Sequence, residues 1–429
     1  MDNLKTKKLN KPLLGEITIP PDKSISHRAL IFGSLTKGEV EIKNLSLGED
    51  CISTLKILEN TGVKAEFTGK RDLILKAPEN FVEPKKELYC GNSGTSARLL
   101  TGYFAGLNLK ATLTGDMSLS KRPMKRVIEP LSQMGAKITS NDNKLPLTIE
   151  KASLKGITYF SPVASAQVKS AILLAGLNAE GETTVYEQYL SRNHSELMFE
   201  YLGANLSKGK DDKGFWVKIK KSFLVPKPLE VPGDISSASF FMVAGAIVPN
   251  SKILIKNVGI NPTRTGILDV FEKADVNFEL LNKRFLGLEE VADILVQYSP
   301  DIKPFEVKGE IIPRLIDEIP VIAVLASRAN GTSVFKDAGD LRNKESDRIK
   351  TMVEAFKTLG IETVERPDGF IIKGGEYQNG GIFKTHLDHR LAMSYYIISL
   401  LNKNEMEIED FNCVNTSFPE FLEVFNKLI

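Results

Sequence analysis

Segment 21–28 (PDKSISHR) combines side chains that could bind phosphate. Lys23, Ser24 and Arg28 fall within about one turn of an expected helix start, which places an ammonium, a hydroxyl and a guanidinium beside free backbone N–H groups. A capped, solvated helix end has the same composition. This segment alone therefore leaves a phosphate site and a plain helix end as alternatives.

Four further segments of the first half could contact an anion. One is rich in small residues, which let a ligand approach the backbone closely. Another has four cations within six residues around a proline, and a solvated loop would look the same. The segments are 91–95 (GNSGT), 119–126 (LSKRPMKR), 165–169 (SAQVK) and 191–194 (SRNH).

The second half mixes carboxylates with cations. Asp317 and Glu318 interrupt an apolar helical pattern, where a carboxylate is usually a cap. Lys344 and Arg348 are four residues apart and would share one face if the segment were helical, with Glu345 between them. An ion-paired surface helix has the same pattern, so both interpretations stay open here.

Composition limits these side chains to a local role. The 429 residues include 56 Lys and Arg against 54 Asp and Glu, a net charge of +2, which provides no global field for nucleic acid or an anionic membrane. Three cysteines form neither a disulfide framework nor a metal motif, and suit a reducing compartment. We expect a cytoplasmic protein of two or three domains that neither spans a membrane nor is secreted.

A long repeat organises the chain. Apolar helical runs begin near Asp22, Asn92, Ala164, Asp234, Leu315 and Leu387, at spacings of 70, 72, 70, 81 and 72 residues. Between them come alternating strands and a second amphipathic helix, which in several units stops at a glycine, as at Gly62, Gly135, Gly203 and Gly360. We predict an α/β fold of six helix–strand units, three in each of two globules.

Most first helices open with Ser, Thr, Asp or Asn, which cap the helix. If their starts faced one cleft, the helix dipoles would attract anions there, whereas ordinary capped core helices need no such cleft. Arg390 stands at the start of the sixth helix, where the dipole disfavours a cation. That placement favours a function for Arg390.

Nine segments in fixed order resemble the 5-enolpyruvylshikimate-3-phosphate synthase family. They are DKSISHRA, GNSGT, LSKRPMKR, SAQVK, VPGDISSASFF, NPTRTG, IDEIP, LRNKESDRI and DHRLAMS. The resemblance covers about Gly15 to Pro419, nearly the whole chain.

The resemblance implies a two-domain, inside-out α/β barrel that closes on its substrates. It implies domains at 21–231 and at 1–20 plus 232–429, with a hinge near 20–21 and 231–233. The family transfers the enolpyruvyl group of phosphoenolpyruvate to the 5-hydroxyl of shikimate 3-phosphate and releases phosphate. This reaction belongs to the shikimate pathway, which leads to chorismate and the aromatic amino acids. The resemblance implies no metal, no cofactor and a monomer.

Site residues are carried over from the same resemblance. Asp317 would be the base for the 5-hydroxyl, Glu345 would protonate the methylene carbon, and Lys23 would touch both substrates. The residues that bind shikimate 3-phosphate would be Lys23, Ser24, Arg28, Ser165, Ala166, Gln167, Arg192, Asp317 and Lys344. Those for phosphoenolpyruvate would be Lys23, Gly94, Arg122, Gln167, Arg348 and Arg390.

Some residues depart from the commonest family pattern. Thr416 and Ser417 precede Phe418 where many members have a lysine, and Ala166 replaces a serine; both variants resemble the class II branch. Some class II members have alanine in place of Gly94, which crowds the inhibitor glyphosate, so tolerance to this inhibitor is open.

Three alternatives remain at this point. The sister family, UDP-N-acetylglucosamine enolpyruvyl transferase, usually has asparagine after its first-helix lysine and a reactive cysteine in the loop matching 113–121; here Ser24 follows Lys23 and that loop has no cysteine. A non-catalytic sensor of phosphorylated metabolites would gain nothing from carboxylates inside an anion site. A nucleic-acid binder is disfavoured by the near-zero net charge.

Overall fold

The computed structural model describes residues 3–429, and they form two compact units. One unit comprises the segment up to Pro20 together with Pro232–Phe285 and Glu290–Ile429, and we call it unit 1. The other, unit 2, comprises Pro21–Val231 and Leu286–Glu289. Each unit has its own continuous hydrophobic core.

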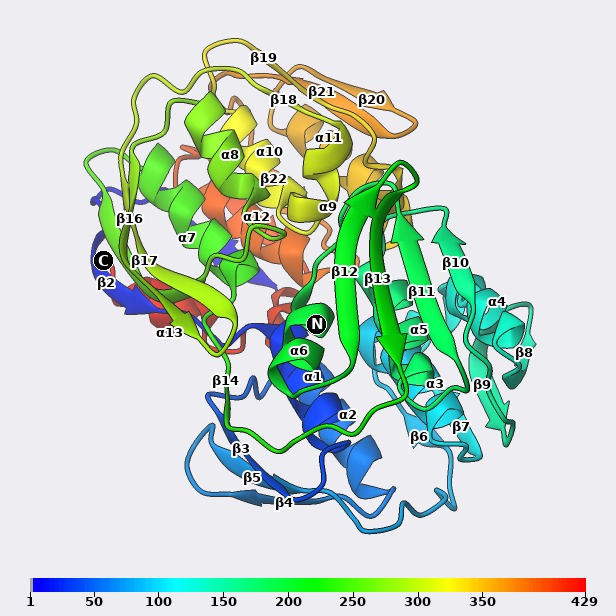
Figure 1. Cartoon of the computed structure of the whole chain (residues 1–429). Helices are drawn as coiled ribbons and strands as arrows, with labels where there is room; N and C mark the ends of the chain where they lie inside the picture. The colour runs from blue at the N-terminus through cyan, green and yellow to red at the C-terminus, as the bar shows by residue number, and fades with distance from the viewer. Residues whose placement is uncertain (1–2) are drawn as a thin grey trace. The chain divides into compact units, whose positions relative to one another are not determined.

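Three four-stranded sheets make up the outer layer of unit 2 (Figure 1). Their orders are β14(Leu229–Glu230)-β3(Glu39–Lys43)-β5(Leu73–Lys76)-β4(Lys64–Phe67), β6(Leu88–Tyr89)-β7(Ala111–Thr114)-β9(Lys144–Glu150)-β8(Lys137–Asn141) and β10(Thr158–Ser161)-β11(Glu182–Glu187)-β13(Gly214–Lys220)-β12(Leu206–Asp211). In each sheet the first two strands are parallel and the other pairs antiparallel. The same small sheet is thus built three times.

Unit 1 repeats this arrangement. Its sheets are β16(Phe278–Leu286)-β17(Glu289–Gln297)-β15(Lys252–Gly259)-β2(Leu14–Thr18), β18(Glu306–Val307)-β19(Thr332–Phe335)-β21(Gly369–Lys373)-β20(Thr363–Arg366) and β1(Leu4–Thr6)-β23(Met406–Ile408)-β22(Gly381–Phe383). Each has one parallel pair, namely β2 with β15, β18 with β19 and β22 with β23. The six-fold repeat predicted from the sequence is confirmed.

The first helix of each repeat lies inside its unit. These helices are α1(Lys23–Gly33), α3(Gly94–Gly106), α5(Ala166–Gly176), α7(Ile235–Ile247), α10(Ile319–Ala326) and α12(His389–Ser399). Every residue of α7 is buried, as expected for a helix that is apolar on all sides. Helices inside and sheets outside give the inside-out α/β fold that the family resemblance implies.

The second helices are α2(Glu49–Glu59), α4(Lys125–Gln133), α6(His194–Tyr201), α8(Gly266–Lys273), α11(Arg348–Thr358) and α13(Phe421–Asn426). The four glycines predicted to stop them all have positive φ, between 80° and 101°. Glycine adopts this left-handed conformation without the clash that a Cβ would cause.

The fifth repeat differs from its prediction. The helix expected from Leu315 begins only at Ile319, as α10. A short helix, α9(Ile312–Leu315), precedes it, and residues 316–318 form a break between the two. Pro320 explains the break, because proline has no N–H and fits only in the first turn of a helix.

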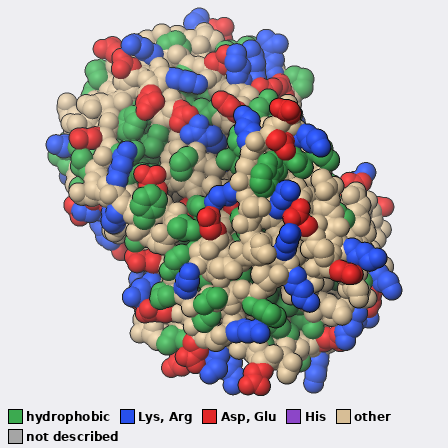
Figure 2. Space-filling model, in the orientation of Figure 1, with side chains coloured by type: hydrophobic (Ala, Val, Ile, Leu, Met, Phe, Trp, Pro, Cys, Tyr) green, Lys and Arg blue, Asp and Glu red, His purple; other side chains and the backbone are tan. Residues whose placement is uncertain are grey.

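Two properties concern the chain as a whole. Basic and acidic side chains are interspersed over the face in view in Figure 2, in keeping with the net charge of +2. Within residues 3–429, no helix is long and apolar enough to cross a membrane.

Candidate active site

The start of α1 carries the first cluster of unit 2. The Asp22 carboxylate accepts a hydrogen bond from the Ile25 amide at 2.8 Å and caps the helix. Lys23 follows, and its Nζ lies 3.0 Å from Oδ2 of Asp50 on α2. The Lys23 side chain keeps 18% of its surface exposed, so the ammonium is paired and still reachable. Ser24 is half-buried beside it.

Arg28 joins three helices of unit 2. Its side chain is buried, with Nε donating to Ser195 Oγ at 2.8 Å and Nη2 donating to Ser170 Oγ at 2.9 Å. Nη1 donates to the backbone oxygen of Ser24 at 2.9 Å. These bonds hold the starts of α1 and α6 against the second turn of α5.

Helices α3 and α5 lie close together because α3 has glycines where they meet. A Cβ on Gly102 would lie 2.1 Å from the Ala171 carbonyl oxygen, so only glycine fits. At the start of α5, Gln167 accepts a hydrogen bond from Arg98 at 2.8 Å and donates one to Thr95 at 2.9 Å.

Two neighbours of Gln167 complete the start of α5. Ser165 caps the helix, with its side chain accepting from the Val168 amide, and Ala166 is the first helical residue. The predicted group Ser165, Ala166 and Gln167 therefore shares one helix start.

Gly94 begins α3 beside two guanidiniums. A Cβ at this position would lie 2.7 Å from Nη1 of Arg98 and 3.5 Å from Nη1 of Arg122. Arg122 is nearly buried, and its Nη2 donates to the Asn92 side-chain oxygen at 2.5 Å. The predicted pair Gly94 and Arg122 is thus brought together at the start of α3.

Arg192 is half-buried in the loop between β11 and α6, three residues before Ser195. A buried ion triad lies beneath this loop: Lys169 Nζ is 2.8 Å from Glu187 Oε2 and 2.6 Å from Glu196 Oε1. Burial opposes the charge of Lys169, but the two carboxylates outweigh it and raise the pKa of Lys169 above its ordinary value.

Unit 1 holds the carboxylates. Asp317 lies in the break between α9 and α10. Its Oδ1 is 3.3 Å from Nζ of Lys344 and 3.6 Å from Nη1 of Arg348, and its side chain is 18% exposed. The structure therefore gathers a carboxylate, an ammonium and a guanidinium from three segments.

Arg348 is the most strongly paired cation of this group. Its side chain is 1% exposed, with Nη2 lying 2.7 Å from Glu345 Oε2 and Nε lying 2.8 Å from Asp388 Oδ2. Burial would lower the pKa of Arg348, but Asp388, Glu345 and Asp317 outweigh burial and raise it. Arg348 is therefore a permanent cation that orients Glu345.

Arg390 lies in the first turn of α12, whose cap is Asp388. The residue is 8% exposed, yet its guanidinium has no hydrogen-bond or ion-pair partner within residues 3–429. A nearly buried cation without a carboxylate partner is costly for a fold to keep, and it is suited to receive an anionic ligand.

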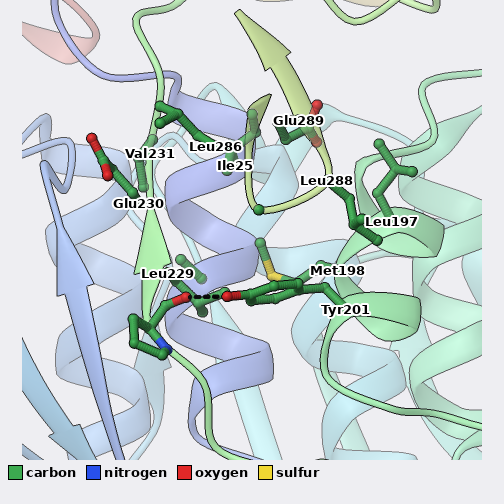
Figure 3. A pocket seen from close by; sticks show the side chains of 13 residues that line it. Ile25, Leu197, Met198, Tyr201, Leu229, Glu230, Val231, Leu286, Leu288 and Glu289 are labelled. Carbon is green, nitrogen blue, oxygen red and sulfur yellow. Dashed lines mark hydrogen bonds between the residues drawn. The ribbon is translucent and has the colours of Figure 1, made fainter. Parts of the chain in front are cut away.

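An apolar pocket lies on another side of α1 (Figure 3). Ile25 and Ala29 of α1, Met198 and Tyr201 of α6, and segments 228–231 and 286–289 form most of its wall. The Tyr201 hydroxyl donates to the Pro228 carbonyl at 3.1 Å across it. The wall contains no Lys or Arg and none of the predicted site residues, so this pocket does not suit two anionic substrates.

Sequence reasoning missed the partners of several site residues. Asp50 pairs with Lys23, Asp388 pairs with Arg348, and Arg98 contacts Gln167. Arg98 alone had a readable signal, because it is a cation one turn into an otherwise apolar helix.

The fold is that of the enolpyruvyl transferases. The enolpyruvyl transferase NikO from Streptomyces tendae, at 15% identity, has the same fold with a TM-score of 0.79 over 100% of this chain and 97% of that one. EPSP synthase from Acinetobacter baumannii is 37% identical, with a TM-score of 0.88 over 100% of this chain and 98% of that chain.

Sequence comparison identifies the particular family. The family model for EPSP synthase (3-phosphoshikimate 1-carboxyvinyltransferase) matches residues 7–425. The 3-phosphoshikimate 1-carboxyvinyltransferase of Thermoanaerobacter sp. (strain X514) is 47% identical over 97% of this chain and 98% of its own. That of Bacillus subtilis (strain 168) is 46% identical over 97% of each. The chain therefore belongs to the EPSP synthase family.

Proposed function

We propose that this chain transfers the enolpyruvyl group of phosphoenolpyruvate to the 5-hydroxyl of shikimate 3-phosphate through the residues predicted above. One observation carries the proposal: the Asp317 carboxylate lies beside two cations, Lys344 and Arg348, on the unit that also bears the unpaired Arg390. A site that only bound anions would be weakened by such a carboxylate, whereas a hydroxyl nucleophile needs a base.

The proton transfers follow from the atoms that must move. Asp317 takes the proton of the 5-hydroxyl as its oxygen attacks C2 of phosphoenolpyruvate, and Glu345 gives a proton to C3. The C3 carbon then returns a proton to the Glu345 carboxylate as the bond between C2 and the phosphate oxygen breaks, which restores the double bond and releases phosphate. Cations around the tetrahedral intermediate stabilise its developing charge.

Several of the residues assigned to shikimate 3-phosphate stand at helix starts, as Lys23 does in α1 and Ala166 in α5. Arg28 and Ser24 are already joined by a hydrogen bond, and α5 offers free N–H groups at its start. The residues assigned to this substrate are Lys23, Ser24, Arg28, Ser165, Ala166, Gln167, Arg192, Asp317 and Lys344.

Phosphoenolpyruvate is assigned to three guanidiniums and their neighbours. Its phosphate and carboxylate can each be bound by two parallel hydrogen bonds from an arginine. The small Gly94 leaves room beside Arg122. The residues assigned to this substrate are Lys23, Gly94, Arg122, Gln167, Arg348 and Arg390.

The sister reaction with UDP-N-acetylglucosamine is not favoured, because the relatives are named for the shikimate substrate. The domain limits, the hinge near 20–21 and 231–233, the monomeric state and the cytoplasmic location stay predictions.

The test of the reaction is an assay of phosphate release from phosphoenolpyruvate. Shikimate 3-phosphate is the acceptor, and UDP-N-acetylglucosamine serves as the control acceptor. We expect phosphate release when shikimate 3-phosphate is the acceptor and none when UDP-N-acetylglucosamine is the acceptor. Release only with the sugar nucleotide would overturn the assignment.

The role of Asp317 is tested by Asp317→Asn. We expect kcat to fall by about 10² to 10⁴ because the proton acceptor is lost, while calorimetry shows shikimate 3-phosphate affinity nearly unchanged. Glu362→Gln removes a carboxylate from an exposed pair with Lys373 in the same unit and serves as the control. Equal losses of kcat and affinity in Asp317→Asn would contradict the role as base.

A further inference from the structure

Two motifs of the resemblance have no substrate role in the proposal above, namely 231–241 (VPGDISSASFF) and 261–266 (NPTRTG). Apart from Val231, both lie in unit 1, and side chains of the two motifs bond Glu318 in the break that carries Asp317. We propose that Arg264, Ser236 and Glu318 are positioning residues that fix this break and so aim the Asp317 carboxylate. The inference rests on the role proposed for Asp317.

The three side chains form a directed chain of hydrogen bonds. Nη2 of Arg264 donates to Ser236 Oγ at 2.7 Å, and that hydroxyl donates its single proton to Oε1 of Glu318. Arg264 also bonds Asp234, the cap of α7, at 3.0 Å. A guanidinium has no acceptor, so the direction from Arg264 to Glu318 is fixed.

Because the three side chains are buried, water cannot readily take over a hydrogen bond that one of them loses. Glu318 is fully buried, Ser236 is 1% exposed and Arg264 is 2% exposed. A buried carboxylate that lost its donor would bear the full cost of desolvation. Glu318 is also the N-cap residue of α10, and its carbonyl accepts from the Ile322 amide at 2.9 Å. Holding Glu318 therefore holds the end of the break that follows Asp317.

The other end of the break is fixed by the same NPTRTG segment. Arg314 of α9 binds Asp269 of α8 through two parallel hydrogen bonds of 2.5 and 3.0 Å, and its Nε donates to the Pro262 carbonyl at 2.8 Å. A Cβ on Gly266 would lie 2.9 Å from the Leu315 Cβ, so glycine lets α9 lie against α8. Both neighbours of residues 316–317 are thus anchored.

Two contacts of the Asp317 carboxylate explain why the backbone of the break needs to be anchored. Its distance of 3.6 Å to Arg348 is too long for a hydrogen bond, and its 3.3 Å contact is to the flexible end of Lys344. Neither of these two contacts by itself sets the direction of the carboxylate closely. Because a displacement of about 1 Å can cost 10²-fold in rate, the backbone beneath Asp317 must be held in place.

The same helix α10 supplies a matched control. At its other end, Ser327 shares a buried hydrogen bond of 2.7 Å with the Tyr377 hydroxyl. Ser236→Ala and Ser327→Ala each remove one buried hydroxyl next to α10, but only Ser236 bonds Glu318, which follows Asp317 in the chain. A merely structural role predicts the same outcome for both variants, namely lower stability with unchanged kcat.

The experiment measures kcat, both KM values and Tm for Ser236→Ala and Ser327→Ala. We expect Ser236→Ala to lower kcat by about 10- to 100-fold with KM values within threefold, and Ser327→Ala to keep kcat within twofold. A kcat for Ser236→Ala within twofold of that for Ser327→Ala would overturn the inference.

A double-mutant cycle separates this inference from the role of Asp317. In the Asp317→Asn background, Ser236→Ala should reduce the residual kcat by less than threefold, because no base remains to be aimed. Should Asp317→Asn keep normal kcat, the base assignment is wrong. Should Asp317→Asn lose activity while Ser236→Ala matches Ser327→Ala, only the positioning inference is wrong.

Glu318 variants decide the question if Ser236→Ala does not fold. Glu318→Gln keeps an oxygen acceptor for Ser236, so we expect kcat within about threefold of the parent protein, whereas Glu318→Leu should lose at least tenfold. Equal losses in the two variants would mean that the charge matters rather than the hydrogen bond, and would overturn the inference.

Discussion

The ion triad of Lys169 offers a test of how burial sets the value of an ion pair. Lys169 and its partners Glu187 and Glu196 have side chains at most 3% exposed. Lys169→Met leaves two carboxylates buried without their cation, at a cost of about 3–5 kcal/mol. For a unit of this size, that corresponds to a fall in Tm of roughly 6–20 °C.

Unit 2 contains a control with the same geometry. Lys208 and Glu200 are 2.6 Å apart, as are Lys169 and Glu196, but their side chains are 42% and 50% exposed. Lys208→Met should cost less than about 1 kcal/mol, because water solvates the remaining carboxylate.

The assay is thermal unfolding followed by circular dichroism at pH 7 for both variants. Adding Glu187→Gln and Glu196→Gln to Lys169→Met should recover part of the lost stability, since the uncompensated charges are then gone. Equal Tm values for Lys169→Met and Lys208→Met would refute the reasoning that burial, rather than distance, determines the cost.

Three further outcomes are expected. Arg390→Ala should raise KM for phosphoenolpyruvate by about 10- to 100-fold through loss of a charged hydrogen bond, yet leave Tm the same or higher; a clear fall in Tm would show that Arg390 stabilises the fold. Gly94→Ala must displace Arg98 Nη1, because a Cβ at this position would lie 2.7 Å from it. Steady-state kinetics should therefore show a higher KM for phosphoenolpyruvate and a larger rise in the inhibition constant of glyphosate. Unchanged values of both constants would mean that Arg98 moves aside freely. Burial raises the pKa of the fully buried Cys90 to about 12, so its thiol is neutral at pH 8 and Ellman's reagent should modify it only after unfolding in guanidinium. Rapid modification of Cys90 in the native protein would contradict this.

The sequence predicted the repeat well because its signals are local. A cap residue, an apolar helix and a terminating glycine lie within a few residues of each other, as in the helix that begins after Asp22. The one local error, the helix expected from Leu315, came from underrating Pro320. A proline in the first turn marks a start, and residues before it belong to another element.

The sequence predicted the charged residues of the candidate site but not the residues that they contact. Its cations could be listed, but their partners lie far along the chain: Arg28 bonds Ser170 and Ser195, which are 142 and 167 residues away. No spacing rule predicts such contacts, since packing of α1 against α5 and α6 creates them. That no carboxylate of residues 3–429 pairs with the Arg390 guanidinium is likewise decided by packing and not by sequence spacing.

The pairing of β2 with β15 has a consequence for the order of folding during synthesis. Leu14–Thr18 form a strand only against Lys252–Lys256, which the ribosome adds more than 230 residues later. The core of unit 2, from Ile25 to Val231, is complete before that partner appears. Leu13 and Ile17, which end in the core of unit 1, therefore stay exposed to solvent while unit 2 is synthesised and folds. During that interval this apolar segment is most open to wrong contacts or to binding by a chaperone.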